Sequence, residues 1–133
     1  YPGKKGNYKE TDSLLPINNY GWSKLGGECA VHMLKNSLIL RLSITDYPFA
    51  YKKAIKNSYS SLIYNKDFAK LFSRLLDSSG VINIGGKRQS IYSFAKNDNP
   101  KIKTVSISKK SNFPKDSSLN IKKFREIIKK SKK

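Results

Sequence analysis

Tyr20 and Lys24 stand four residues apart in a stretch whose pattern favours a helix, so their side chains should emerge from one face, one turn apart. A free phenol loses its proton only near pH 10, but a neighbouring ammonium favours the phenolate form. Such a pair can exchange a proton with a substrate oxygen, while the ammonium holds sugar hydroxyls. The same spacing also fits a tyrosine ring that simply packs over a lysine stem, and the pair alone does not decide between the two.

The helix that carries this pair is predicted to begin at Asn18 or Asn19, either of which can act as the N-cap, and to run for about four turns. Its three glycines each cost up to about 1 kcal/mol in a helix interior, so we expect another part of the chain to approach it closely. Its packed face is expected to hold four side chains at helical spacing: Leu25, Cys29, His32 and Met33.

Strands and helices alternate along the rest of the chain, which predicts an α/β fold. Residues 38–42 form an apolar run typical of a buried parallel strand, and Arg41 within it is expected to be packed or salt-bridged. Residues 1–17 are rich in turn-forming residues and predict a surface loop. The other expected strands are 61–64, 80–84 and 102–107, and the other expected helices are 49–55, 67–76, 91–96 (capped by Ser90) and 119–128.

Length and composition exclude several classes of protein. The chain has 133 residues, enough for one domain, and no apolar run approaches the roughly 20 residues that cross a bilayer. The start of the chain lacks the apolar stretch of a signal peptide. The single Cys29 and single His32 exclude an internal disulfide and are too few for a structural zinc site. We therefore expect a cytoplasmic protein with no metal ion and no association with membranes.

The net charge of +18 raises the question of nucleic acid. The basic residues are 23 Lys and only 4 Arg, whereas recognition of bases and phosphates favours arginine. Residues 101–133 hold 12 basic and 2 acidic side chains, with no RNA-binding or zinc-finger signature beside them. We expect a solvated basic tail rather than a nucleic-acid arm, and keep a basic binding module for nucleic acid or an anionic surface as an alternative.

An ordered series of motifs covers nearly the whole chain. Residues 16–28 read Pro-Ile-Asn-Asn-Tyr-Gly-Trp-Ser-Lys-Leu-Gly-Gly-Glu. Later motifs are Leu-Arg-Leu-Ser at 40–43, Tyr-Asn-Lys-Asp-Phe-Ala at 64–69, Gly-Val-Ile-Asn-Ile-Gly-Gly at 80–86, then Ser90 and Phe94-Ala95. The series resembles the extended short-chain dehydrogenase/reductase family, in particular its dTDP-4-dehydrorhamnose reductases and NAD-dependent sugar-nucleotide epimerases.

This resemblance implies an NAD(P)-dependent oxidoreductase acting on a sugar nucleotide. Tyr20 would be the general acid that protonates the carbonyl oxygen at sugar C4 as hydride arrives. Lys24 would assist Tyr20, and both side chains would contact the NADP or NAD cofactor. The backbone near Leu42 and Ser43 would border the nicotinamide. An epimerase or dehydratase acting on a sugar nucleotide is the alternative enzyme.

The resemblance also implies where the substrate binds, because the family builds its variable sugar-nucleotide pocket in the region of residues 45–64. Tyr47, Phe49 and Lys52 are the candidates there, and a lysine in this region could meet the diphosphate. An ordinary solvated surface is the alternative for the lysine. Residues 1–44 would end the Rossmann-type domain, and residues 45–133 would form the substrate-binding domain with the basic tail.

The cofactor-binding half of the family is expected to be absent from this chain. No G-x-G-x-x-G or G-x-x-G-x-x-G sequence occurs in it, and it does not begin with Met. Tyr1 matches an aromatic residue that follows the family's catalytic Ser or Thr by a short distance. We therefore expect the last parallel strands and helices of the fold, a strand at 38–42 without its parallel neighbour, and no activity of the chain alone. Its expected partners are a nucleotide sugar and an N-terminal half or a second copy.

Overall fold

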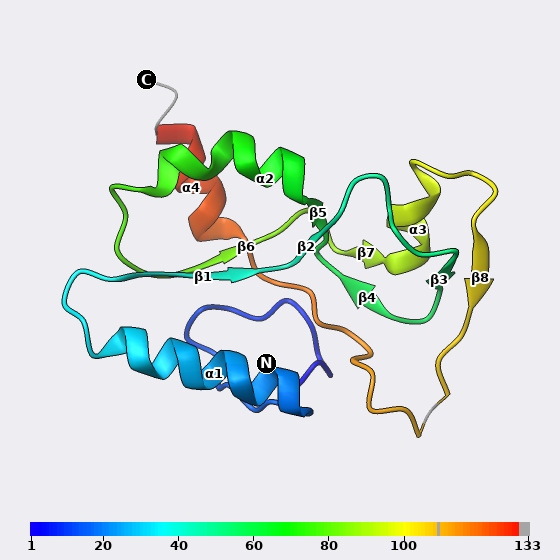
Figure 1. Cartoon of the computed structure of the whole chain (residues 1–133), viewed down its shortest axis with the longest axis horizontal. Helices are drawn as coiled ribbons and strands as arrows, with labels where there is room; N and C mark the ends of the chain where they lie inside the picture. The colour runs from blue at the N-terminus through cyan, green and yellow to red at the C-terminus, as the bar shows by residue number, and fades with distance from the viewer. Residues whose placement is uncertain (109, 131–133) are drawn as a thin grey trace.

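The structure is a computed structural model that describes residues 1–108 and 110–130, so Lys132 and Lys133 of the predicted basic tail lie outside the described residues. Strands and helices alternate, which confirms the α/β prediction (Figure 1). The elements in chain order are α1 (Asn19–His32), β1 (Leu38–Leu42), β2 (Ile44–Thr45), β3 (Lys53–Ile55), β4 (Tyr59–Ser60), β5 (Ile63–Tyr64), α2 (Asn65–Phe72), the 3-10 helix η1 (Ser73–Leu75), β6 (Gly80–Ile84), β7 (Gln89–Ser90), α3 (Ile91–Lys96), β8 (Lys103–Val105) and α4 (Lys122–Lys130).

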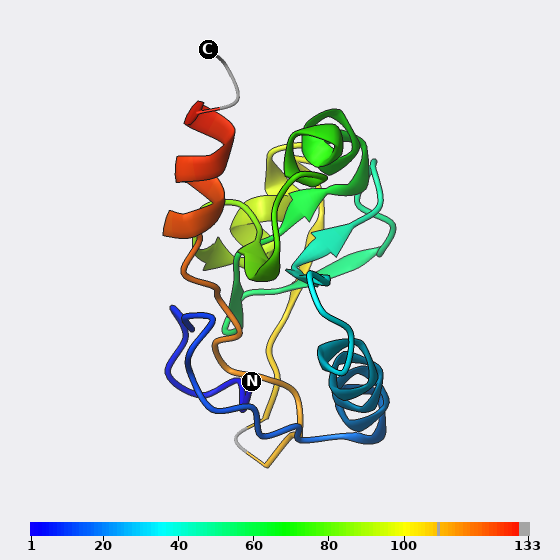
Figure 2. The ribbon, with the colours of Figure 1, turned by 90° about the vertical axis from the view of Figure 1, so that its left-hand side faces the viewer.

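The centre of the molecule is the parallel pair β1–β6, aligned from Leu38 opposite Gly80 to Leu42 opposite Ile84. The strand at 38–42 therefore has a parallel neighbour within this chain, and the expectation that it would lack one was wrong. In the views of Figures 1 and 2, α2 and α4 lie above this pair and α1 lies below it. The main core forms on the α2 and α4 side, from Leu75, Ile82, Ile84 and Phe124.

A second, smaller core lies under α3. Ala54, Ala95 and Ile102 are buried there, and Phe49 packs against them. The helix predicted over 49–55 was wrong, because residues 53–55 form β3, which pairs in parallel with β8. Burial of Ala54 and the hydrogen bonds to β8 outweigh the local preference for a helix.

The loop at the N-terminus is anchored to the opposite end of the chain. Tyr8 is 1% exposed, its backbone N–H donates to the Ser118 carbonyl at 3.0 Å, and its own carbonyl accepts from Asn120 N–H at 2.7 Å. Gly6 has φ +68°, and a Cβ there would collide with the Asp116 carboxylate. The turn-rich segment is thus a loop with one buried aromatic anchor, not a purely superficial one.

The end of β6 approaches the backbone at residues 61–62 so closely that a Cβ on Gly85 or Gly86 would collide with the Ser61 or Leu62 carbonyl. This contact explains the paired glycines by packing.

Over residues 1–108 and 110–130, no helix is both long and apolar enough to span a membrane.

Candidate functional site

The tyrosine–lysine pair lies on the first helix as the spacing predicts. The Asn18 side chain caps α1 by accepting from Gly21 N–H at 2.9 Å. Lys24 Nζ lies 5.3 Å from the centre of the Tyr20 ring, so the two side chains share one side of the helix. Tyr20 is 71% exposed, and no described residue forms a hydrogen bond with its hydroxyl or with the Lys24 ammonium. Both groups can therefore meet a ligand.

A bidentate ion pair ties this helix to the central strand. Arg41 on β1 donates from Nε to Glu28 Oε2 at 3.0 Å and from Nη2 to Glu28 Oε1 at 2.5 Å. The side chains are 14% and 12% exposed. Hydrogen bonds from Arg41 hold the pKa of Glu28 below its usual range, although partial burial acts in the opposite direction. Arg41 is thus the salt-bridged strand residue that was expected, and its partner lies two turns beyond Tyr20.

A buried polar network continues from this ion pair. Arg41 Nη1 donates to the Tyr1 hydroxyl at 2.6 Å. The one proton of that hydroxyl is shared between the Lys9 carbonyl at 2.8 Å and Asn83 Oδ1 at 3.0 Å. The Asn83 side chain is fully buried and donates to the Tyr8 carbonyl at 2.8 Å. Burial raises the pKa of the Tyr1 hydroxyl despite the hydrogen bond from Arg41.

Asn83 is not among the site residues that the sequence predicts. An asparagine between isoleucines in the predicted strand 80–84 was the signal that a polar partner lies on the other side of that strand. Tyr1 had been singled out only for its place in the family motif. In the structure its hydroxyl links Arg41 on β1 to Asn83 on β6.

The packed face predicted for α1 was wrong for three of its four residues. Cys29 and His32 are exposed, Met33 is 85% exposed, and only Leu25 is partly covered. The helix contains no buried residue, and nothing lies within 4 Å of a Cβ built on Gly26 or Gly27. The helix faces the strand pair with the side that carries the charged Glu28, so apolar spacing alone predicted the wrong face.

Leu42 and Ser43 lie where β1 ends. Leu42 is 41% exposed. Ser43 N–H donates to the Ile84 carbonyl at 3.0 Å, and the Ser43 carbonyl accepts from Ile63 N–H at 2.9 Å. The backbone of Ser43 is therefore engaged within the fold, and Leu42 is the more available of the two.

Tyr47 and Phe49 belong to a chain of aromatic rings. Tyr47 meets Tyr64 edge-on with centroids 5.1 Å apart, Tyr64 lies 4.6 Å from Phe94, and Phe94 lies 6.5 Å from Phe49. Tyr47 is half exposed, and the Lys66 ammonium lies over its ring. Lys52 is exposed, and among the described residues its ammonium lies over none of these rings.

The Tyr64 hydroxyl donates to the Asp98 carboxylate beside these rings. Burial, and then this hydrogen bond, raise the pKa of Tyr64. Tyr64 therefore keeps its proton at neutral pH, and its hydrogen bond to Asp98 fixes a ring in the middle of the aromatic chain.

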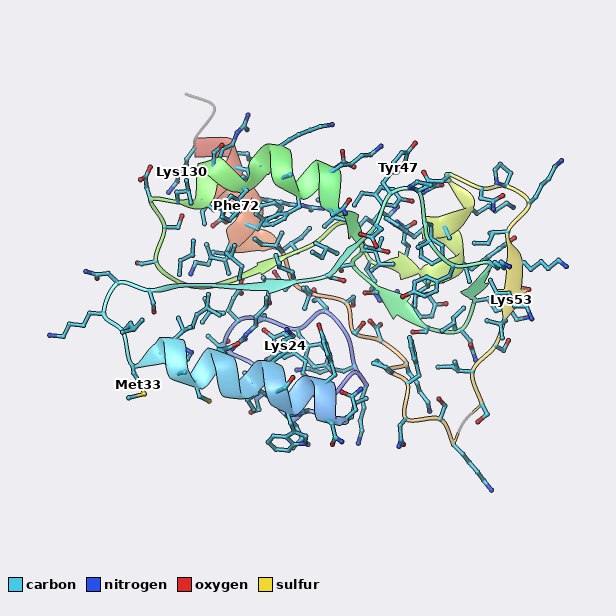
Figure 3. All side chains as sticks on the ribbon, in the orientation of Figure 1. Lys24, Met33, Tyr47, Lys53, Phe72 and Lys130 are labelled. Carbon is cyan, nitrogen blue, oxygen red and sulfur yellow. The ribbon has the colours of Figure 1, made fainter. Side chains whose placement is uncertain are left out.

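The structure does not bring the two groups of predicted site residues together. Figure 3 shows Lys24 below the central strands and Tyr47 on the far side of them. The tyrosine–lysine pair and the aromatic residues therefore lie on two separate surfaces of the described chain. Within its described parts, no three His, Cys, Asp or Glu side chains gather closely enough to hold a metal ion.

Comparisons with known proteins give structural likeness only. No family model matches the chain, and no curated protein matches it. A solved structure of a hypothetical dTDP-4-dehydrorhamnose reductase from Sulfolobus tokodaii is 31% identical, with a TM-score of 0.79 over 96% of this chain and 54% of that chain. A dTDP-4-dehydrorhamnose reductase from Bacillus anthracis, in complex with NADP, is 21% identical, with a TM-score of 0.74 over 94% of this chain and 54% of that one.

Another solved relative is an epimerase. UDP-glucuronic acid 4-epimerase from Bacillus cereus, in complex with NAD, is 21% identical, with a TM-score of 0.63 over 93% of this chain and 50% of that one. The chain thus spans about half the length of the structures it matches. In fold and in its ordered motifs, it resembles the C-terminal part of an extended short-chain dehydrogenase/reductase, of the kind represented by dTDP-4-dehydrorhamnose reductases and UDP-glucuronic acid epimerases.

Proposed function

We propose that this chain supplies the proton-donating pair and the substrate-binding region of an NAD(P)-dependent sugar-nucleotide reductase. The observation that carries the proposal is the exposed pair on α1, with Lys24 Nζ 5.3 Å from the Tyr20 ring and no described partner for either polar group. The likeness to a reductase at 31% identity supports the same reaction class. The activity requires a nucleotide-binding half beyond the residues of this chain.

Tyr20 is the general acid in this proposal. Its hydroxyl donates a proton to the carbonyl oxygen at sugar C4, and the Lys24 ammonium stabilises the phenolate that remains. When bound, the nicotinamide cofactor supplies the hydride. Lys24 also holds ribose hydroxyls of the cofactor, and its free ammonium donors fit that task. The exposed Leu42 borders the nicotinamide ring in this proposal. Ser43 is less available for that contact, because its backbone N–H and carbonyl are hydrogen-bonded within the fold.

The substrate-binding residues of the proposal are Tyr47, Phe49 and Lys52. The half-exposed Tyr47 ring offers a face for stacking. Phe49 packs against Phe94, at the other end of the same chain of aromatic rings. The exposed Lys52 can reach a diphosphate. Because Tyr47 lies away from Lys24, these residues hold the part of the nucleotide sugar that is farther from the reacting carbon. The division into residues 1–44 and 45–133 follows from this assignment and remains a prediction.

The test measures turnover of the chain joined to a nucleotide-binding half, either as one polypeptide or from a second one. We expect Tyr20→Phe to lower kcat for NADPH-dependent reduction of a 4-keto sugar nucleotide by roughly 10²–10⁴-fold, because the general acid is lost. Lys24→Ala should lower kcat and raise the KM for the cofactor. Trp22→Phe is the matched control, since Trp22 is exposed on the same helix. Unchanged turnover in Tyr20→Phe would remove Tyr20 from the mechanism.

A sugar-nucleotide epimerase is the second candidate, because one structural neighbour is an epimerase in complex with NAD. The same tyrosine can remove a proton from a sugar hydroxyl and return it in the reverse step. The two reactions differ in their stoichiometry. A reductase consumes one NADPH or NADH per product, whereas an epimerase interconverts sugar nucleotides with no net consumption of cofactor.

A further inference from the structure

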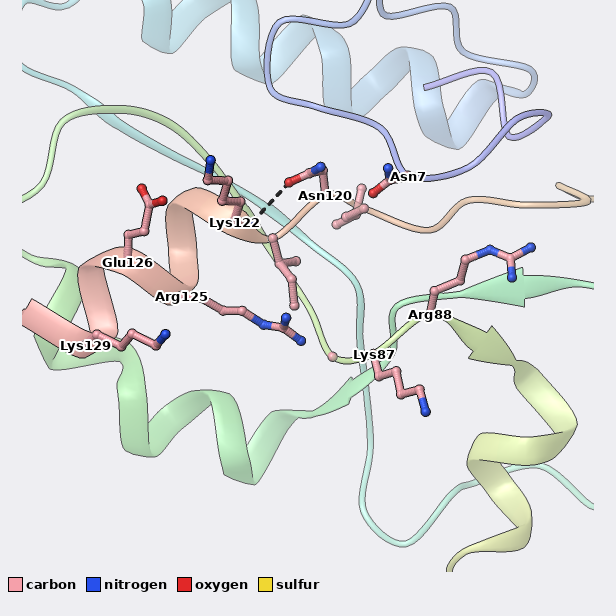
Figure 4. Close-up of a pocket in the computed structure, with 11 residues that line it drawn as sticks. Asn7, Lys87, Arg88, Asn120, Lys122, Arg125, Glu126 and Lys129 are labelled. Carbon is pink, nitrogen blue, oxygen red and sulfur yellow. Dashed lines mark hydrogen bonds between the residues drawn. The ribbon is translucent and has the colours of Figure 1, made fainter.

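A hollow of about 520 Å³ lies beside the last helix (Figure 4), and neither Tyr20 nor Lys24 lines it. The turn after β6 forms one wall, and the exposed side of α4, opposite the buried Phe124, forms the other. Its charged lining consists of Lys87, Arg88, Lys122, Arg125 and Lys129, with Glu126 as the single carboxylate. We call this set of residues the basic hollow. It contains two of the four arginines in the chain.

Four of the five cationic side chains in the basic hollow have no ion pair among the described residues. Arg88 forms an ion pair with Asp116, Nη2 to Oδ2 at 2.7 Å. None of the other four cations has a carboxylate within ion-pair distance in the described parts of the chain. Five cationic groups around one concave surface repel each other, and the concave shape strengthens their field.

Helix α4 adds to this positive field. Its first turn contains Lys122 and no acidic residue, although the N-terminal end of a helix favours negative charge. Arg125 and Lys129 follow at a spacing that places like charges next to each other, which also disfavours the helix. A bound anion would relieve both effects.

The side chains are arranged to meet such an anion. In Figure 4, Arg125 points from α4 toward the turn at Lys87, and Lys129 extends along the same side of the helix toward Arg125. The planar guanidinium of arginine matches two phosphate oxygens at once, and lysine adds a point charge. Asn120 accepts from Lys122 N–H at 3.1 Å through Oδ1, so its amide NH₂ remains available as a donor.

We propose that the basic hollow binds a phosphate or diphosphate group through Arg125 and Lys129. Its volume falls within the roughly 300–1,000 Å³ of small-molecule sites. The group can come from free pyrophosphate or from a nucleoside diphosphate, and both carry the same chemistry. This site uses none of the residues of the proposed reaction, so a test of phosphate binding does not depend on whether the proposed reaction is correct.

The test titrates the 133-residue chain with pyrophosphate, UDP, dTDP and uridine, and follows binding by calorimetry and by chemical shifts of the α4 amides. We expect 1:1 saturable binding of pyrophosphate and of both diphosphates, and none of uridine. The double variant Arg125→Gln/Lys129→Gln should weaken the affinity by about tenfold or more, because two charge-assisted hydrogen bonds are lost. Lys101→Gln/Lys103→Gln is the matched control, since these exposed lysines lie at β8.

The outcomes separate the possible ligands. Equal affinity for pyrophosphate and UDP assigns the site to the phosphates alone, whereas tighter binding of UDP or dTDP assigns it to a nucleotide; both support the proposal. Absence of binding overturns it, as does equal weakening in both double variants, which would mean diffuse charge. Much tighter binding of a single-stranded oligonucleotide, with a steep loss between about 50 and 200 mM salt, would replace it with a nucleic-acid surface.

Discussion

Asp116 is a buried acidic residue that joins three segments. Its carboxylate accepts from Ser118 N–H at 3.0 Å and from Arg88 Nε at 2.9 Å, and its backbone N–H donates to the Gly3 carbonyl at 3.0 Å. Burial alone would raise the pKa of Asp116, but the hydrogen bonds from Ser118 and Arg88 outweigh burial and leave the pKa below its usual range. The ionised form is therefore the one that stabilises the fold.

This pKa shift predicts how the stability depends on acid. Because the pKa of Asp116 is lower in the folded chain, its contribution is present above the unfolded value near pH 4 and is lost as the pH falls through the folded value. We expect Asp116→Asn to lower the free energy of unfolding at pH 7 by about 1–3 kcal/mol, because hydrogen bonds to a charged group are lost. Urea unfolding at pH 7 and at pH 3 measures both effects.

The variant should also lose less stability on acidification than the wild-type chain, since it has no carboxylate at this position to protonate. Asp77→Asn is the control, because Asp77 is exposed and has no ion pair among the described residues. Equal acid sensitivity of wild type and Asp116→Asn would assign the acid response to other carboxylates, with Glu28 the next candidate.

At the scale of elements, α1 depends on one polar contact more than on apolar burial. The helix has no buried residue, and Glu28 receives two hydrogen bonds from Arg41. The strand pair β1–β6 supplies a fixed base for Arg41, because Nη1 of the guanidinium donates to the Glu10 carbonyl and to the Tyr1 hydroxyl, and that hydroxyl is hydrogen-bonded to Asn83 on β6. The orientation of Tyr20 and Lys24 thus rests on a contact located two turns along the helix.

We therefore expect Glu28→Gln to loosen α1 without unfolding the rest of the chain. The neutral amide leaves Arg41 partly buried without its charge partner, and the helix gains no apolar contact in exchange. Hydrogen exchange of the α1 amides should become at least about tenfold faster, whereas exchange in β1 and β6 should change little. His32→Gln is the control on the same helix, with its ring 3.5 Å from Glu28. Equal acceleration in α1 and β6 would contradict this separation.

The elements also show what sequence patterns can and cannot predict. The cap at Asn18, the apolar strand at 38–42 and the helix capped by Ser90 follow from local chemistry, and the structure confirms them. The strand at 53–55 was mistaken for a helix because its partner β8 lies about 50 residues later, beyond any local pattern. The exposed side of α1 was mistaken for its packed side because the contact with β1 is ionic, and apolar spacing does not detect it.

The site shows the same limit. Residue types and motifs predicted the tyrosine–lysine pair, and α1 displays it as expected. The network through Tyr1 and Asn83 could not be predicted, because its members come from three distant segments and meet only in the folded chain. The separation between Lys24 and Tyr47 in Figure 3 also depends on how the segments fold around β1 and β6.

At the scale of the whole molecule, the net charge of +18 on 133 residues sets the balance between repulsion and ion pairing. Two ion pairs involve well-covered carboxylates, Glu28 with Arg41 and Asp116 with Arg88. Most of the lysines are exposed and repel each other over distances that salt screens, since the Debye length is about 10 Å at 0.1 M. Salt therefore weakens the repulsion between exposed lysines more than it weakens the attraction within the two ion pairs that have covered carboxylates.

Salt should therefore stabilise this chain. We expect the melting temperature to rise by roughly 3–8 °C between about 20 and 300 mM sodium chloride, because screening removes about 1 kcal/mol of repulsion or more. Thermal unfolding followed by far-ultraviolet circular dichroism measures this rise. A flat or falling melting temperature would mean that the two covered ion pairs outweigh the lysine repulsion. Phosphate at equal ionic strength should stabilise the wild-type chain more than chloride does, through general exclusion from the protein surface and through binding in the basic hollow. The double variant Arg125→Gln/Lys129→Gln separates the two effects, because it loses only the part that comes from binding.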